Sequence, residues 1–150
     1  MTCNMKESVE KPNKNHQVLL AEDNEDHYIL TREAINEAHL PMDLAWVQDG
    51  EELMNYLQHK SPELILLDLN MPKKSGKEAL REIKASPLLR RIPVVAFTSS
   101  DSEADIEATF DLGVNSYIQK PFGFDRFVST MKTLYDYWFG VSKLPAGSKP

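Results

Sequence analysis

Four consecutive aliphatic residues, Leu64 to Leu67, are followed at once by an aspartate, Asp68. An uninterrupted aliphatic run of this length is typical of a strand buried on both faces of a parallel sheet. Pro72 cannot donate a backbone hydrogen bond, so the strand is expected to end before it. Asp68 is therefore predicted at the carboxyl end of a central strand, where open α/β sheets bind their ligands.

Short apolar runs alternate with helical patterns along the whole chain. Strands are expected at 18–21, 44–47, 64–68, 92–97 and 115–119. Helices are expected at about 26–38, 51–59, 77–85, 101–112 and 124–139. Ser100 and Glu103 form a capping-box pattern at the start of the fourth helix. This alternation predicts an α/β fold, a doubly wound five-stranded parallel sheet with helices on both faces.

Composition narrows the possible functions. The 150 residues are enough for one domain, expected at 18–140, with a polar leader at 1–17 and a tail at 141–150. The net charge of -6 argues against nucleic acid as the main partner. The single cysteine, Cys3, cannot form an internal disulfide, which fits a cytoplasmic location. No apolar run approaches the length that spans a bilayer, and none resembles a signal peptide.

Polar residues follow four of the expected strands. Glu22 and Asp23 follow the first strand, Asp68 ends the third, Thr98 follows the fourth and Lys120 follows the fifth. The carboxyl ends of parallel strands share one edge of a sheet, so these side chains should meet. A lone aspartate at a strand end more often caps a loop or a helix, and each of the others has an equally ordinary explanation. Their convergence favours a shared site.

The expected side chains suit a phosphoryl group and a divalent cation. Three carboxylates in one site repel each other unless a cation or a proton intervenes. Mg²⁺ is commonly held by one or two carboxylates, with water and phosphate oxygens completing its octahedron. Lys120 would supply a point charge for an anion near Asp68, and Thr98 a neutral donor. The sequence therefore predicts a magnesium-dependent site for a phosphoryl group attached to, or attacked by, Asp68.

The Glu22-Asp23 pair, Asp68, Thr98 and Lys120-Pro121 together resemble the signature of CheY-like receiver domains of bacterial response regulators. The resemblance covers about residues 18–139 and implies the strand order 2-1-3-4-5. A narrower similarity is to cyanobacterial phytochrome-partner regulators. It rests on the long leader, the 86–91 segment before the fourth strand, and the Thr98-Ser99-Ser100 ending of that strand.

The resemblance implies a role for each site residue. Asp68 would be the phosphoacceptor, receiving its phosphoryl group from a phosphohistidine on a sensor histidine kinase. Asp23 and Asp68 would bind Mg²⁺ directly, together with the backbone carbonyl of Asn70, while Glu22 would act through a metal-bound water. The chain would catalyse only its own phosphorylation and dephosphorylation, and would not be an enzyme with an external substrate.

The remaining roles concern the response to phosphorylation. Lys120 would pair with the phosphoryl oxygens, and the Lys120–Pro121 peptide is expected to be cis. Thr98 and Tyr117 would form the switch, with the hydroxyl drawn to the new anion and the aromatic ring turning inward behind it. This would bias a pre-existing equilibrium between two states.

Partners and alternatives remain open at this point. The resemblance implies a phytochrome-class kinase as partner and signalling by protein contact. Neither nucleic acid nor a membrane is expected as a partner. The aromatic residues near the end of the last helix indicate either a homodimer interface on the last two helices or ordinary core packing. A phosphatase would need a second aspartate where Asn70 stands, whereas a phosphorylation-independent pseudo-receiver would not need the intact site. The four histidines have no spacing typical of a zinc site.

Overall fold

The computed structural model describes residues 15–145, so most of the expected leader and half of the expected tail lie outside the described residues. Five parallel strands form one sheet in the order β2-β1-β3-β4-β5, which confirms the predicted fold class and strand order. The strands are β1 (His16–Ala21), β2 (Met42–Val47), β3 (Leu64–Leu67), β4 (Val94–Thr98) and β5 (Ser116–Gln119). The helices are α2 (Glu25–Glu37), α3 (Gly50–Leu57), α4 (Gly76–Ala85), α5 (Glu103–Asp111) and α6 (Phe124–Tyr135).

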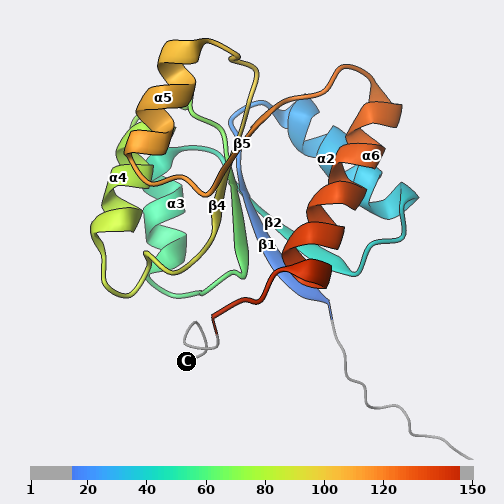
Figure 1. The fold of residues 1–150 in the computed structure, drawn as a ribbon, viewed down its shortest axis with the longest axis horizontal. Helices are drawn as coiled ribbons and strands as arrows, with labels where there is room; N and C mark the ends of the chain where they lie inside the picture. Colours follow the sequence, from blue (N-terminus) through green and yellow to red (C-terminus); the bar gives the residue numbers. More distant parts are fainter. Residues whose placement is uncertain (1–14, 146–150) are drawn as a thin grey trace, which may run out of the picture.

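Helices cover both faces of the sheet (Figure 1), and the alternation of side chains in β1 explains how. Val18 and Leu20 pack in one apolar cluster with residues of α2 and α6. Leu19 and Ala21 point the other way, into a second cluster with residues of α3 and α4. Because every residue of β3 is buried, the central strand contributes to both clusters.

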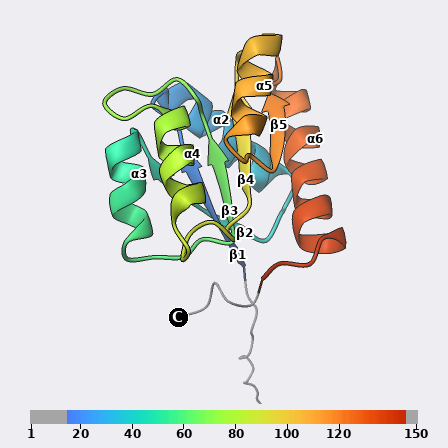
Figure 2. The same ribbon diagram turned by 60° about the vertical axis from the view of Figure 1, so that its left-hand side comes forward.

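The strand register brings the expected site residues to one edge. Ala21 is paired with Leu67, so the residues that follow them, Glu22 and Asp68, leave the sheet side by side. Thr98 is paired with Gln119, which places Lys120 one residue beyond the end of β4. Figure 2 shows the arrowheads of the parallel strands pointing to this same end of the molecule.

Some local expectations were wrong. The cap of α5 is Ser102, whose side chain accepts a hydrogen bond from the Asp105 N–H. The expected cap, Ser100, instead donates its hydroxyl to the Asp105 carboxylate at 2.7 Å. The Lys120–Pro121 peptide is trans, since the described residues contain no cis peptide. β1 also begins at His16, two residues earlier than expected.

The last helix is α-helical only to Tyr135 and continues as a π-helical segment, η1 (Asp136–Val141). Tyr135, Trp138 and Phe139 pack against the cluster shared with α2, and the Phe139 ring stacks on His16 with centroids 4.1 Å apart. Core packing therefore explains these three aromatic residues. Tyr137 differs, because half of its surface is exposed. None of the described helices is long and apolar enough to cross a membrane.

Candidate functional site

An acidic cluster lies at the carboxyl edge of the sheet. Glu22 and Asp23 come from the loop after β1, and Asp68 from the end of β3. One carboxylate oxygen from each lies within 4.8 Å of the others, although Glu22 and Asp68 are buried and Asp23 is exposed. The sequence prediction that these three carboxylates would meet is therefore confirmed.

Both oxygens of the Asp68 carboxylate have partners. Oδ1 accepts a hydrogen bond from the Asn70 N–H at 3.2 Å, and Oδ2 accepts one from the Lys120 ammonium at 3.3 Å. The Asp68 N–H itself donates to the carbonyl of Ala21, continuing the ladder between β1 and β3. These contacts fix the carboxylate at the mouth of the site and leave Asp68 only 6% exposed.

Glu22 is held in place by its neighbours. Its N–H donates to Val47 O, its carbonyl accepts from the Trp46 indole at 2.7 Å, and its Oε2 accepts from the Asn24 N–H at 3.1 Å. Burial raises the pKa of the Glu22 carboxyl to about 7, against the lowering effect of the nearby Lys120 charge. A buried carboxyl with a raised pKa is a common feature of functional sites.

Lys120 joins the two sides of the site. Its ammonium nitrogen lies 2.5 Å from Glu22 Oε1 and 3.3 Å from Asp68 Oδ2, and its side chain is 6% exposed. A third neighbour is the His27 ring, whose Nδ1 lies 2.9 Å away. The buried ammonium thus lies between two carboxylates and a ring nitrogen, and it offsets the negative charge of the cluster.

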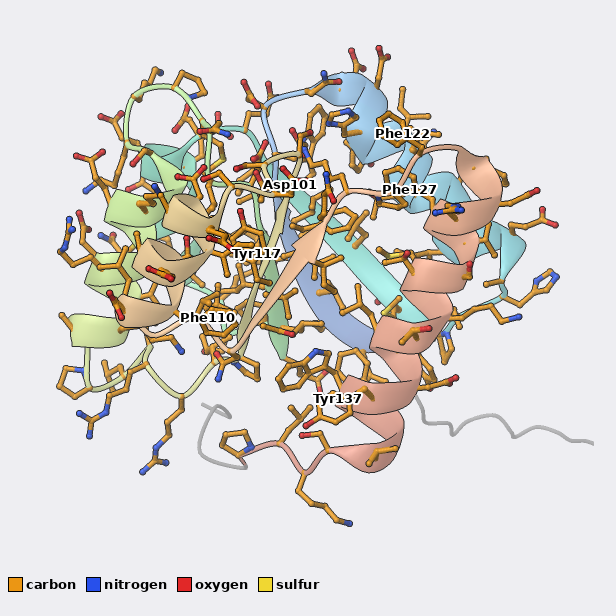
Figure 3. All side chains as sticks on the ribbon, turned by 45° about the horizontal axis from the view of Figure 1, so that its top comes forward. Asp101, Phe110, Tyr117, Phe122, Phe127 and Tyr137 are labelled. Carbon is orange, nitrogen blue, oxygen red and sulfur yellow. The ribbon has the colours of Figure 1, made fainter. Side chains whose placement is uncertain are left out.

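Two residues near the cluster were expected to form a switch. Thr98 is fully buried, and its hydroxyl makes no hydrogen bond to any residue in the described part of the chain. Tyr117 lies on β5 next to α5 (Figure 3), where its hydroxyl donates to the carbonyl of Ser100 at 3.0 Å. A buried hydroxyl without a hydrogen-bond partner is costly. The Thr98 hydroxyl is therefore free to donate a hydrogen bond to an acceptor that enters the site.

The donor set fits a hard divalent cation. Carboxylate oxygens from two loops are the ligands that Mg²⁺ prefers in proteins, and the exposed Asp23 leaves room for water. Burial raises the pKa of Glu22, and the negative charge of Asp68 raises it further. A nearby cation would favour the ionised form of both carboxyls.

Sequence reasoning missed His27. It treated the histidines only as candidate zinc ligands, whereas the His27 ring contacts Lys120, 93 residues away in the sequence. One signal was available: His27 lies in the first turn of α2, four residues after Asp23. A side chain at that position starts at the same edge as the site.

Comparison with known proteins agrees with this geometry. The response regulator receiver domain family matches residues 18–132. Response regulator Rcp1 of Synechocystis sp. is 37% identical over 136 residues, which cover 86% of this chain and 92% of Rcp1. The probable methanogenesis regulatory protein FilR2 of Methanothrix harundinacea is also 37% identical, over 85% of this chain and 86% of FilR2.

Solved structures give the same result. The phosphorylated cyanobacterial phytochrome response regulator RcpA has a TM-score of 0.82 and 39% identity, covering 88% of this chain and 99% of its own. The Mn²⁺-bound form of Rcp1 has a TM-score of 0.78 and 36% identity, covering 87% and 99%. Together with the fold and the acidic cluster, these similarities show that the chain belongs to the response regulator receiver family.

Proposed function

We propose that this chain receives a phosphoryl group on Asp68 from a sensor histidine kinase and signals through protein contacts. The observation that carries the proposal is the meeting of Asp68, the acidic pair and Lys120 at one edge of the sheet. We expect the protein to act in the cytoplasm, and to turn over no external substrate. The division into leader, receiver unit at 18–140 and tail stays a prediction.

The residues of the cluster would hold Mg²⁺ as the cofactor. Asp23 and Asp68 would be direct ligands with the backbone carbonyl of Asn70, and Glu22 would act through a bound water. The Mn²⁺-bound Rcp1 structure supports a divalent cation in a relative of this chain. When bound, the cation would offset the negative charge that phosphoryl transfer concentrates in the site.

In the proposed transfer, an oxygen of the Asp68 carboxylate forms a bond to phosphorus. The bond between phosphorus and the imidazole nitrogen of the donor breaks, and that nitrogen leaves with the electron pair. Lys120 and Thr98 would donate hydrogen bonds to the phosphoryl oxygens. Because little covalent chemistry is asked of the protein, positioning and charge do most of the work.

The proposed switch begins at Thr98. A phosphoryl oxygen would give its buried hydroxyl the acceptor that it lacks among the described residues. Movement of Thr98 would shift the adjacent segment that carries Ser100, whose carbonyl holds the Tyr117 hydroxyl. Tyr117 would then turn inward, which changes the surface of α5 and β5.

Intact mass spectrometry after incubation with Mg²⁺ and acetyl phosphate tests the proposal. The wild-type chain should gain one phosphoryl group, and Asp68→Asn or added EDTA should prevent the gain. Asp49→Asn is a matched control, because Asp49 is a buried aspartate after β2 that caps α3, and asparagine caps equally well. If neither acetyl phosphate nor a histidine kinase phosphorylates the wild type, the pseudo-receiver alternative is favoured.

For the kinase partner we propose a phytochrome. The 39% identity to RcpA supports this choice, whereas the 37% identity to FilR2 makes a direct test necessary. Phosphotransfer from a phosphorylated phytochrome kinase should be faster than transfer from a kinase without a phytochrome sensor. Equal rates would contradict a dedicated phytochrome partner.

We also propose that a second copy of the chain binds on the outer side of β5 and α6. A groove of about 550 Å³ lies there, lined by Ser116, Ile118, Ser129, Thr130, Thr133, Leu134, Tyr137 and Trp138. Neighbouring α5 exposes acidic side chains, including Glu103 and Glu107, while α6 exposes the basic Arg126 and Lys132. This opposite charge suits a two-fold contact in which each copy presents both helices.

Analytical ultracentrifugation tests the proposed dimer. Tyr137→Asp should lower the dimer fraction, because Tyr137 lies in the groove and is half exposed. Leu88→Asp is the matched control, since Leu88 is an exposed apolar residue between α4 and β4. A wild type that stays monomeric with and without acetyl phosphate would contradict the proposal.

A further inference from the structure

We infer that His27 is a positioning residue for phosphorylation: its Nδ1 atom holds the ammonium of Lys120 toward Asp68. The inference rests on the proposed function and deepens it. The contact behind it is the 2.9 Å distance between His27 Nδ1 and Lys120 Nζ.

The contact fixes the protonation state of the ring. A lysine ammonium has only donors, so His27 Nδ1 must accept, and the ring proton must be on Nε2. Burial lowers the pKa of His27, and the positive charge of Lys120 lowers it further, which favours the neutral ring. His27 is thus a neutral acceptor beside two carboxylates.

The backbone of His27 is fixed by a chain of contacts that starts at Glu22. The Glu22 carboxylate accepts from the Asn24 N–H, and the Asn24 side chain accepts from the His27 N–H at 3.2 Å. One turn further, the buried Thr31 hydroxyl donates to the His27 carbonyl at 2.8 Å. The first turn of α2 therefore holds His27 in a defined place relative to the acidic cluster.

A neutral acceptor can hold Lys120 even when a cation and a phosphoryl group occupy the site. Glu22 and Asp68 would then share their negative charge with the cation, so both would hold Lys120 less strongly. His27 carries no charge to share, and it would keep one N–H of Lys120 while the others face the phosphoryl oxygens. Without it, the flexible four-carbon side chain of Lys120 would be less well oriented.

Three variants separate this role from a structural one. Asparagine places an oxygen where Nδ1 lies, glutamine places one where Nε2 lies, and alanine places none. Helix propensity runs the other way, in the order alanine, glutamine, asparagine. If His27 positions Lys120, the maximum phosphorylation rate should be highest for His27→Asn, whereas a role in helix stability would make it the lowest.

The test measures the rate of phosphorylation against acetyl phosphate concentration at saturating Mg²⁺, which avoids any effect on kinase docking. His27→Ala and His27→Gln should lower the maximum rate about tenfold, the usual effect of losing one hydrogen bond to a charged group. His27→Asn should retain a rate within about threefold of the wild type. Mg²⁺ affinity, measured by calorimetry, should stay unchanged in all three variants.

Several results would overturn the inference. One is an unchanged or faster phosphorylation rate for His27→Ala, and another is a set of rates that follow helix propensity. A third is a fall in Mg²⁺ affinity parallel to the fall in rate, which would make His27 a metal ligand. His27 is about one-third exposed, so the variants leave no large cavity, and thermal denaturation checks that they fold. A wild type that no donor phosphorylates would instead refute the proposed function, and this inference with it.

Discussion

The carbonyl oxygen of Asp68 lies 2.2 Å from the position that a β-carbon on Gly76 would occupy. The same β-carbon would stand 2.6 Å from the Cα of Leu69. Both neighbours are backbone atoms, which cannot move aside as a flexible side chain can. Gly76 also donates its N–H to the carbonyl of Leu69, so the start of α4 closes directly onto the end of β3. The position of the candidate phosphoacceptor thus depends on a glycine eight residues later.

Gly76→Ala should therefore lower the free energy of unfolding by about 2–4 kcal/mol and abolish phosphorylation by acetyl phosphate. The reason is that relief of the overlap must displace the backbone of Asp68. Urea denaturation and intact mass measure the two effects. Gly140→Ala is the matched control, because its β-carbon would have nothing within 4 Å. If Gly76→Ala is phosphorylated to the same extent as the wild type, the site tolerates the displacement of the Asp68 backbone.

Glu22 should make stability depend on pH in the metal-free protein. Its folded-state pKa of about 7 lies above the ordinary 4.5, so the folded state binds the proton more tightly than the unfolded state. The stability from this protonated carboxyl is complete below pH 4.5 and is lost as pH rises to about 7. Glu22→Gln should then raise the free energy of unfolding by about 2–3 kcal/mol at pH 8, and by little at pH 4.

Urea denaturation at the two pH values, in EDTA, measures this difference. Glu107→Gln is the matched control, because it removes an exposed carboxylate from α5. An equal effect of Glu22→Gln at both pH values would mean that folding does not change the pKa of the Glu22 carboxyl.

The sequence was enough to predict the sheet and its shared edge, for a physical reason. The aliphatic run at 64–67 and the crossover spacing leave few arrangements other than a doubly wound parallel sheet. Once the strands are parallel, residues that follow them must meet, and the cluster of Glu22, Asp23 and Asp68 follows. The order of the strands could not be predicted in the same way. That prediction came from the family resemblance and from no property of the residues themselves.

Details that depend on competition between side chains were not predictable. Ser100 and Ser102 are both suitable caps for α5, and the choice was decided by the Asp105 carboxylate, which takes the Ser100 hydroxyl. His27 contacts Lys120 only because the first turn of α2 and the end of β5 meet in space. The choice of cap leaves no mark in local sequence patterns, and the position of His27 in the sequence shows only that it starts at the edge of the sheet that carries the site.

Lys120→Met should change metal binding and phosphorylation in opposite directions. The ammonium lies 2.5 Å from Glu22 Oε1 and 3.3 Å from Asp68 Oδ2, so it competes with a cation for the same carboxylates. Its removal should tighten Mg²⁺ binding about tenfold, because electrostatic effects between close partly buried charges have that order. The phosphorylation rate should fall at least about a hundredfold, since a charge that faces the phosphoryl oxygens is lost.

Calorimetry with Mg²⁺ and the rate with acetyl phosphate test both effects. Lys77→Met is the matched control, because Lys77 pairs with Asp105 at 2.9 Å, between α4 and α5. Weaker Mg²⁺ binding in Lys120→Met would contradict the competition between Lys120 and the cation.

Asn115→Ala should destabilise the fold without touching the site. The Asn115 carboxamide oxygen accepts from the Val94 N–H at 2.8 Å and from the Lys84 ammonium at 3.1 Å. Alanine would leave the buried Val94 N–H without that acceptor, which should cost about 1–3 kcal/mol in the free energy of unfolding. Asn115→Asp keeps an acceptor oxygen at the same place and should cost much less. Urea denaturation compares the two, and equal losses would mean that the side-chain oxygen of Asn115 contributes little to the start of β4.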